Sequence, residues 1–421
     1  QAVYADNGKL HVADGGGGFY LLETEFKAAV FTVNSTGDAM DALPGDGICD
    51  DGTGDCTLRA AINEANATPG YNTIAFDIEG VGPHTIQPAS ALPTIIDPVE
   101  IDGSSEPDFL GTPIVELDGS LIEVDNGLNF ATNNCLISNL VISGFDGASE
   151  NFEASGIYIL NGRNIIIEGC YIGTNNLGSS ANGNVIGVVL TGSYNQIRSN
   201  LISGNTRLGL EVSNFEEEAA SFNHITNNKF GTDISGMSVL PNEGNGCELL
   251  GASANYIIGN TFSGNAGYGL QLTDGATENV VQGNFIGCDP TGTMRVPNEN
   301  SGVNIRNDAH DNLIGGIEPG SGNVISGNNR AGMSIGQGSG AFNNLIQGNL
   351  IGTNAAGEDS LVNTSAGITM FGGSVGNIIG GSQDGAGNTI SGNRGLGIDM
   401  RSGGTQNIIE GNFIGTDVSG A

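Results

Sequence analysis

The sequence contains no tryptophan, and only 6% of its residues are aromatic. Basic residues are scarce as well, since 12 Lys and Arg stand against 46 Asp and Glu and leave a net charge of −34. This shortage of positive charge argues against nucleic acid or an anionic membrane surface as a partner. There is also no run of about 18 apolar residues, so no membrane-spanning helix is expected. A core with so few aromatic residues must be built from Ile, Val and Leu.

Glycine is abundant instead, with 71 of 421 residues, and it follows no Gly-X-Y period that would indicate collagen. A unit of about fourteen residues recurs along the chain. Its clearest copy is Asn407–Gly420, and earlier copies span Asn279–Gly292 and Asn344–Gly357. A repeat of this kind indicates stacked supersecondary units rather than a single globular core.

Each repeat holds short runs of β-forming residues bracketed by Gly and Asn. One run always begins with Gly and then alternates apolar and mostly polar residues, which is the period of a strand. The nine copies are 22 to 37 residues apart, as three short strands and three turns per rung require. The sequence therefore predicts an all-β fold, a right-handed parallel β-helix of about a dozen rungs and roughly 55–60 Å at ~4.8 Å per rung. The nine runs begin at Gly156, Gly187, Gly209, Gly246, Gly269, Gly302, Gly332, Gly367 and Gly397.

Asparagine recurs at the predicted corners between strands. Stacked Asn side chains can hydrogen-bond from rung to rung, and Asn also tolerates the left-handed backbone of a sharp corner. We therefore interpret these residues as structural. The positions are Asn200, Asn228, Asn260, Asn284, Asn349 and Asn412.

The N-terminal part departs from the repeat. Residues 1–30 form an extension, residues 31–79 a capping segment, and residues 80–421 the predicted β-helix. The capping segment holds one good helix pattern, over residues 57–66, with Thr57 as the N-cap. Its apolar residues recur at i, i+3, i+4 and i+7 and so share one face, which can cover the open first rung.

The segment Cys56-Thr-Leu-Arg-Ala-Ala-Ile-Asn-Glu-Ala-Asn66 resembles the Cys-Ser-Leu-Arg-Glu-Ala-Ile signature that opens a group of secreted bacterial β-helix proteins. Thr57 and Ala60 depart from that signature. The downstream Gly-Asn-x-Ile-Gly-Thr-Asp repeats resemble the same group, so the likeness covers roughly residues 31–421. It implies a pectate-lyase-like right-handed β-helix and an exported, surface-associated life. It implies no reaction, because architecture defines the group.

An acidic loop precedes the predicted helix. Its two cysteines, Cys49 and Cys56, are expected to form a disulfide in an oxidising compartment. Two interpretations of its aspartates are open, a calcium loop of hard oxygen ligands on Gly-permitted turns or a solvated acidic turn. The other cysteines, Cys135, Cys170, Cys247 and Cys288, are left unpaired. The aspartates are Asp46, Asp50, Asp51 and Asp55.

Catalytic candidates are weak. Asp308, His310 and Asp311 form the one local cluster of acid and imidazole groups, beside Arg306, and a solvated polar corner is the favoured interpretation of them. Asp399 and Arg401 would lie three rungs away, about 14 Å by strand spacing. The basic residues are dispersed along the chain, and no basic patch stands out. The sequence therefore leaves enzymatic activity uncertain and leans against it.

The predicted function is that of a secreted structural protein at the cell surface or in an extracellular filament, with adhesion as a candidate role. The chain ends in mid-repeat, and an uncapped solenoid end could stack head to tail on another copy. The apolar N-terminal strand would be the link, or it would fold back as a cap. The alternative is a polysaccharide-binding or polysaccharide-degrading lyase, hydrolase or epimerase. The linking residues would be Phe19, Tyr20, Leu21, Leu22 and Phe26.

Overall fold

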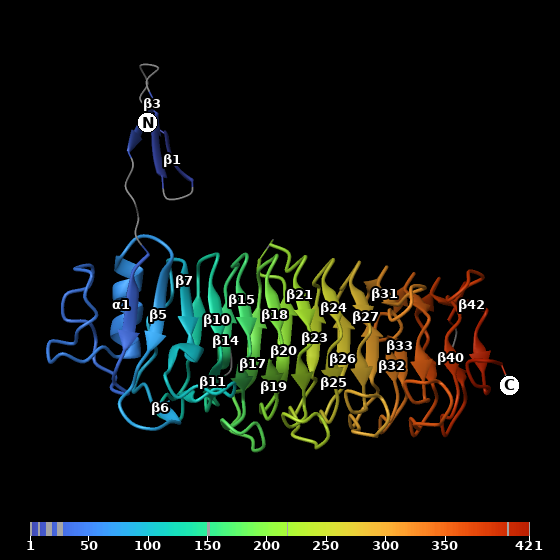
Figure 1. Ribbon diagram of the computed structural model, residues 1–421. Coiled ribbons are helices and arrows are strands. Elements are labelled where there is room, and N and C mark those ends of the chain that lie inside the picture. Colours follow the sequence, from blue (N-terminus) through green and yellow to red (C-terminus); the bar gives the residue numbers. More distant parts are fainter. Residues whose placement is uncertain are drawn as a thin grey trace.

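The computed structural model describes residues 2–6, 9–13, 19–22, 28–149, 152–216, 218–401 and 404–420. Within them the chain winds into a parallel β-helix, a rod whose rungs follow one another from α1 to the C-terminal end (Figure 1). Three long sheets run along the rod, and every neighbouring pair of strands in them is parallel. The expected fold class and the expected number of rungs are both confirmed.

Sheet I has thirteen strands in the described part of the chain: β4 (Val30–Val33), β5 (Asn72–Phe76), β7 (Val99–Asp102), β10 (Leu136–Ser138), β15 (Ile166–Glu168), β18 (Gln196–Arg198), β21 (His224–Thr226), β24 (Tyr256–Ile258), β27 (Val280–Gln282), β31 (Leu313–Gly315), β35 (Leu345–Gln347), β39 (Ile378–Gly380) and β42 (Ile408–Glu410). Its first two strands, apart from Val30, lie inside the predicted capping segment, so the β-helix begins before residue 80.

Sheet II has twelve strands over the same described residues: β6 (His84–Ile86), β8 (Val115–Asp118), β11 (Leu140–Ser143), β16 (Tyr171–Ile172), β19 (Leu201–Ile202), β22 (Lys229–Phe230), β25 (Thr261–Phe262), β28 (Phe285–Ile286), β32 (Val324–Ile325), β36 (Leu350–Ile351), β40 (Thr389–Ile390) and β43 (Phe413–Ile414).

Sheet III contains all nine Gly-led strands that the sequence predicts. Its described strands are β9 (Leu128–Phe130), β14 (Ser155–Ile159), β17 (Ile186–Leu190), β20 (Leu208–Ser213), β23 (Cys247–Leu250), β26 (Leu270–Thr273), β29 (Val303–Arg306), β33 (Met333–Gln337), β37 (Ile368–Met370) and β41 (Ile398–Met400).

Several short elements lie at the corners between the strands of the long sheets. They are the 3-10 helix η1 (Gly103–Ser105), the antiparallel pair β12 (Ala148–Ser149) and β13 (Phe152–Glu153), and the small parallel sheet of β30 (Ala309–His310), β34 (Ala341–Phe342) and β38 (Ser374–Val375).

The core is a stack of aliphatic columns. In sheet I, for example, Ile137, Ile167 and Ile197 pair in register and are fully buried. Each rung places its Ile, Val or Leu directly on that of the previous rung, so the apolar area removed from water grows along one axis. This explains how a chain with few aromatic residues can still form one continuous core.

The expected asparagine ladder is confirmed, and the described residues contain three such ladders. Asn228 is typical, because its Nδ2 donates to Asn260 Oδ1 at 3.0 Å and its Oδ1 accepts from Asn200 Nδ2 at 3.0 Å. The expected left-handed backbone is wrong for these residues. The left-handed conformation falls on the residue just before, as at Ser199 (φ 56°) and Asn227 (φ 56°). That residue makes the corner, which leaves the ladder Asn to point inward and bond.

The N-terminal end of the rod is covered by α1 (Leu58–Ala67). Thr57 is its N-cap, with Oγ1 accepting from Ala60 N at 3.0 Å. The predicted apolar face of α1, which includes Ala61 and Ile62, packs against the core of the first rung. Arg59 fixes the helix to the preceding loop through an ion pair with Asp38 at 2.8 Å. The predicted helix and its capping role are confirmed.

The described strands of the N-terminal extension do not join the solenoid sheets. β1 (Ala2–Asp6), β2 (Lys9–Ala13) and β3 (Phe19–Leu22) form their own antiparallel sheet (Figure 1). The apolar strand that was expected to cap the rod or link two copies is therefore paired with β2. Phe26 lies outside the described residues.

End-to-end assembly stays a prediction. Apolar side chains of the last described rung are exposed, among them Ile408 and Ile414. At the other end α1 covers the apolar cross-section, so in a head-to-tail stack the exposed rung of one copy would meet α1 of the next. None of the described helices is long and apolar enough to cross a membrane.

Candidate functional site

The outer face of sheet III carries a row of side chains in register, one from each rung. The residues directly before and after each of them in the same strand point into the core. Because side chains alternate along a strand, this row faces outward. Four consecutive members are polar and nevertheless buried, so neighbouring side chains must shield them from solvent. From β9 to β41 the row is Asn129, Tyr158, Val189, Glu211, Glu248, Gln271, Asn304, Ser334, Thr369 and Asp399.

A groove of about 230 Å³ lies over the C-terminal half of this row. Ser334 and Thr369 form its floor, and Phe371 lies on one wall. Two guanidinium groups, Arg330 and Arg401, line it. The other lining residues are Tyr268, Asn300, Ser301, Ala331, Gln337 and Ser365.

The two arginines are held differently. Arg401 donates from Nε to Asp399 at 2.7 Å, and its guanidinium carbon lies 5.9 Å from the centre of the Phe371 ring. Both Arg401 and Arg330 are exposed, and the Arg330 guanidinium bonds no other side chain or backbone group in the described part of the chain. The groove therefore presents at least one unneutralised positive charge over a floor of hydroxyl groups.

The strand pairing is irregular at this groove. Ile305 pairs with Ile335, but Arg306 pairs with Gln337, so Gly336 is an extra residue in β33. Gly336 has φ 90°, and a Cβ atom there would clash with Ser374 Oγ. Bulges of this kind re-aim the following side chain and are common near binding sites. Here the bulge brings Gln337 to the groove, where Oε1 accepts from the Tyr268 hydroxyl at 3.5 Å.

The N-terminal half of the same row is acidic. Glu211 and Glu248 are direct partners on neighbouring strands, and like charges in that position repel. Ser213 Oγ donates to Glu211 and Asn245 Nδ2 donates to Glu248, each at 2.9 Å. Burial, and then the charge of Glu211, raise the pKa of Tyr158 above its usual range. The face of sheet III therefore changes from acidic to basic along the rod.

The catalytic candidates from the sequence lie elsewhere, at the corner that follows sheet III. His310 Nδ1 is 2.8 Å from Asp311 Oδ2 and 3.1 Å from Thr277 Oγ1. Asp308 is exposed on the turn before them, with φ 66°. No second carboxylate or basic group of the described chain bonds His310, so a catalytic role for the three stays a prediction. Arg401 lies three strands further along sheet III, as expected.

The acidic loop contains the expected disulfide between Cys49 and Cys56. Its aspartates accept hydrogen bonds from backbone N–H groups of the turns to which they belong. Asp46 Oδ1 accepts from Ile48 N at 2.9 Å, and Asp50 Oδ1 accepts from Gly52 N at 2.7 Å.

The rest of the loop follows the same pattern, since Asp51 Oδ1 accepts from Thr53 N at 2.8 Å. Asp55 belongs to the turn through its carbonyl, which accepts from Asp51 N at 2.9 Å. Across the described residues no three His, Cys, Asp or Glu side chains are grouped as metal ligands. Calcium binding by this loop stays a prediction.

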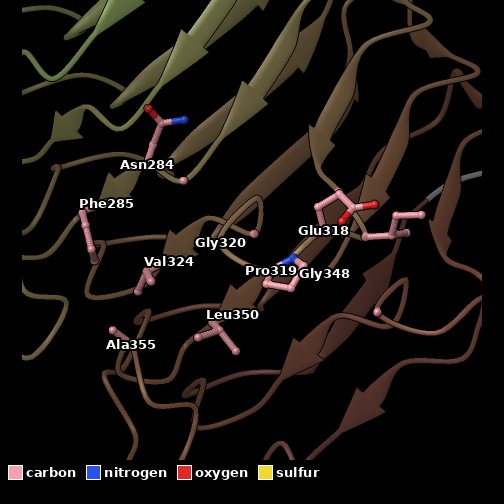
Figure 2. A pocket seen from close by; sticks show the side chains of 14 residues that line it. Asn284, Phe285, Glu318, Pro319, Gly320, Val324, Gly348, Leu350 and Ala355 are labelled. Carbon is pink, nitrogen blue, oxygen red and sulfur yellow. The ribbon is translucent and has the colours of Figure 1, made fainter.

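A second cavity, of about 540 Å³, lies outside sheet II (Figure 2). Its apolar side chains are mainly Phe285, Val324 and Leu350, and much of the remaining wall is glycine backbone. Glu318 is its one carboxylate, and Asn284 is committed to an asparagine ladder through Nδ2. This cavity therefore offers few polar groups that could orient a ligand.

The groove residues escaped sequence reasoning because they are far apart in the chain. The signal was available in the alignment of the nine Gly-led strands. Arg306, Phe371 and Arg401 all stand four residues after the leading Gly, and Arg330 stands two before it. Extending the alignment to the fifth residue would have placed Arg306 and Arg401 at equivalent positions, but in only two of the nine runs.

Comparison with known proteins agrees with this architecture. The family described as "Right handed beta helix region" matches residues 98–286. No curated protein matches the chain. The A-module of the mannuronan C-5 epimerase AlgE6 of Azotobacter vinelandii is similar, with a TM-score of 0.55 and 17% identity over 91% of this chain and 98% of that chain. The likeness shows the fold alone: a right-handed parallel β-helix.

Two further solved structures are less similar. Dettilon tailspike protein has a TM-score of 0.47 and 16% identity, over 90% of this chain and 68% of that chain. A DFA-IIIase from Arthrobacter chlorophenolicus A6 has a TM-score of 0.43 and 13% identity, over 90% of this chain and 86% of that chain.

Proposed function

We propose that this protein binds an anionic polysaccharide along the outer face of sheet III. The observation that carries the proposal is the meeting of Arg330 and Arg401 in one polar groove of a chain with 12 basic residues and a net charge of −34. Guanidinium groups suit carboxylates because they present several donors in a planar fork. Hydroxyl groups on the floor, from Ser334 and Thr369, suit the hydroxyls of a sugar.

The shape of the site supports a polymer rather than a small molecule. The groove is open and follows the rod, and successive rungs are about 4.8 Å apart, close to the length of one sugar ring. Each sugar would therefore meet one rung. Similarity in fold to an enzyme named for mannuronan agrees with a carbohydrate ligand.

The surrounding negative charge would repel a polyanion at long range. At physiological ionic strength, however, charges more than about 8 Å apart are largely screened from one another. The local arginines therefore decide the interaction. The Cys49–Cys56 disulfide supports a location in an oxidising compartment, outside the cytoplasm, where such polymers occur.

The test is titration calorimetry with polyuronate oligosaccharides and with their carboxyl-reduced, neutral counterparts. We expect binding of the acidic form only, weakened by added salt. Arg330→Ala and Arg401→Ala should each lower affinity by about 10-fold or more, the effect of losing a charge-assisted hydrogen bond.

Arg198→Ala is the matched control. Arg198 is paired with Glu168 at 2.6 Å on sheet I, away from the groove, so its loss should leave affinity unchanged. Failure of the wild-type protein to bind any acidic oligosaccharide would overturn the proposal. So would an equal loss in all three variants, because that would indicate a general effect of charge.

Cleavage of the bound polymer is a second candidate function, favoured by Glu211 and Glu248. Their strands are adjacent, about 4.8 Å apart, which is close to the carboxylate separation of ~5–5.5 Å in retaining glycosidases. If they act as acid and nucleophile, Glu211→Gln and Glu248→Gln will abolish release of new reducing ends and leave oligosaccharide affinity intact. An absence of reducing ends from the wild-type protein would exclude this activity for the polymer tested.

A further inference from the structure

Two polar atoms on β29, beside the groove, are buried without a hydrogen-bond partner in the described structure: Asn304 Oδ1 and Arg306 Nε. Asn304 belongs to the outward row, because Val303 and Ile305 on either side of it point into the core. It is nevertheless 0% exposed. Nearly all buried polar atoms in folded proteins are paired, so two unpaired ones on the same side of one strand need an explanation.

The two strands that flank β29 are joined by a bridge between side chains. Tyr268 directly precedes the Gly-led strand on one side of β29, and Gln337 ends the strand on the other side. Their side chains join across β29 through the hydroxyl–amide contact of 3.5 Å. This length is at the outer limit of a hydrogen bond, so the bridge is weak. The bulge at Gly336 is what allows Gln337 to reach it.

The chemistry of the two covered atoms is complementary. Asn304 Nδ2 is already committed to Gln271 Oε1 at 3.0 Å, which leaves Oδ1 free to accept. Arg306 Nε can only donate, and it carries a positive charge. A ligand that satisfies both must present an acceptor and, close to it, a hydroxyl donor, and an anionic acceptor gives the stronger bond to a guanidinium. A uronic sugar carries both groups on one ring, whereas a neutral sugar lacks the anionic one.

We infer that Asn304 and Arg306 form an inner subsite, continuous with the groove of Arg330 and Arg401, that receives one uronate unit when the Tyr268–Gln337 bridge opens. The sugar carboxylate accepts from the Arg306 guanidinium, and a ring hydroxyl donates to Asn304 Oδ1. This inference rests on the proposed function and adds to it the residues that select the acidic unit.

The experiment compares Asn304→Ala and Arg306→Lys with the wild-type protein, by calorimetry with a polyuronate oligosaccharide. Each change should weaken binding by about 10-fold, because each removes a specific hydrogen bond to a charged or hydroxyl group. Arg306→Lys keeps the charge, so the salt dependence of binding should be retained while affinity falls. Arg198→Lys is the matched control and should bind as the wild type does. Thermal unfolding of each variant checks that the fold is intact.

Tyr268→Phe tests the bridge. It removes the hydroxyl and keeps the ring, so the covered state loses its bond and the open state becomes more populated. Since apparent affinity scales with the population of the competent state, binding should tighten by about 2- to 5-fold and associate faster. A purely structural role for Tyr268 predicts no change in affinity.

The outcomes separate the two proposals. If Asn304→Ala and Arg306→Lys bind as tightly as the wild type while Arg330→Ala and Arg401→Ala do not, the inner subsite is overturned and polysaccharide binding stands. If the wild-type protein binds no acidic oligosaccharide, both are overturned. The subsite is supported if Tyr268→Phe binds more tightly and four variants bind more weakly: Asn304→Ala, Arg306→Lys, Arg330→Ala and Arg401→Ala.

Discussion

Replacement of Asn228 by Ala tests how much the asparagine ladders contribute to stability. The Asn228 side chain is buried and makes four hydrogen bonds. Its Nδ2 donates to Ile197 O at 2.7 Å and to Asn260 Oδ1 at 3.0 Å. Its Oδ1 accepts from Asn200 N and from Asn200 Nδ2, both at 3.0 Å.

The cost follows from what the substitution leaves unpaired. Asn200 Nδ2 keeps a second acceptor, Ile167 O, at 2.9 Å, but the bond from Asn200 N to Asn228 is lost. An unpaired buried N–H costs about 1–3 kcal/mol, and the remaining lost bonds and the cavity add to it. We therefore expect Asn228→Ala to lower the free energy of unfolding by about 3–5 kcal/mol.

The assay is equilibrium urea unfolding followed by far-ultraviolet circular dichroism. Asn343→Ala is the matched control, since Asn343 is exposed and has φ 52°, so that only the left-handed backbone penalises Ala, by about 1 kcal/mol. A loss for Asn228→Ala no larger than that of the control would refute the reasoning. It would mean that water or a relaxed rung replaces the ladder bonds at little cost.

Three further predictions concern the disulfide of the acidic loop, the buried cysteine thiols and the carboxylate of Asp289. Replacing Cys49 and Cys56 with Ser should lower the free energy of unfolding by about 2–3 kcal/mol, because their disulfide closes a short loop; an unchanged urea midpoint would contradict this. Burial raises the pKa of Cys135 to about 11 and that of Cys170 to about 12, so at pH 8 native protein should react with a thiol reagent far more slowly than urea-unfolded protein, which should titrate four thiols. Burial tends to raise the pKa of Asp289, but hydrogen bonds from its own loop outweigh it and hold that pKa below the usual value. The stabilisation that this carboxylate supplies is therefore present above the unfolded pKa of about 3.9 and is lost as the pH falls through the folded pKa. Asp289→Asn should accordingly lower the free energy of unfolding at pH 7 and lower it much less at pH 3, as measured by urea unfolding.

Local patterns in the sequence determined most of the architecture. The Gly-led alternating runs are strands of sheet III, the i, i+3, i+4, i+7 pattern after Cys56 is α1, and Thr57 caps it. These features were predictable because each depends on a few neighbouring residues: alternation of side chains in a strand, spacing of one face in a helix, and a hydroxyl placed before a helix.

The asparagine ladders were predictable in kind but not in backbone detail. The repeat shows that Asn recurs once per rung, and stacking follows. Which residue takes the left-handed conformation depends on how the corner closes on the rung below, and the fold assigns it to the residue before Asn200 and Asn228 rather than to the Asn itself.

Only the tertiary structure decided the candidate site. Arg330 and Arg401 are distant in sequence and share no local motif, and the bulge at Gly336 and the bridge from Tyr268 to Gln337 depend on three successive rungs. In a solenoid, residues from different rungs become neighbours when their strands align, so a column across rungs holds information that no single stretch contains. The sequence by itself determined the rod and its cap, because those depend on contacts repeated in every rung. The groove consists of residues that differ from rung to rung, so only the register in which the rungs stack determined it.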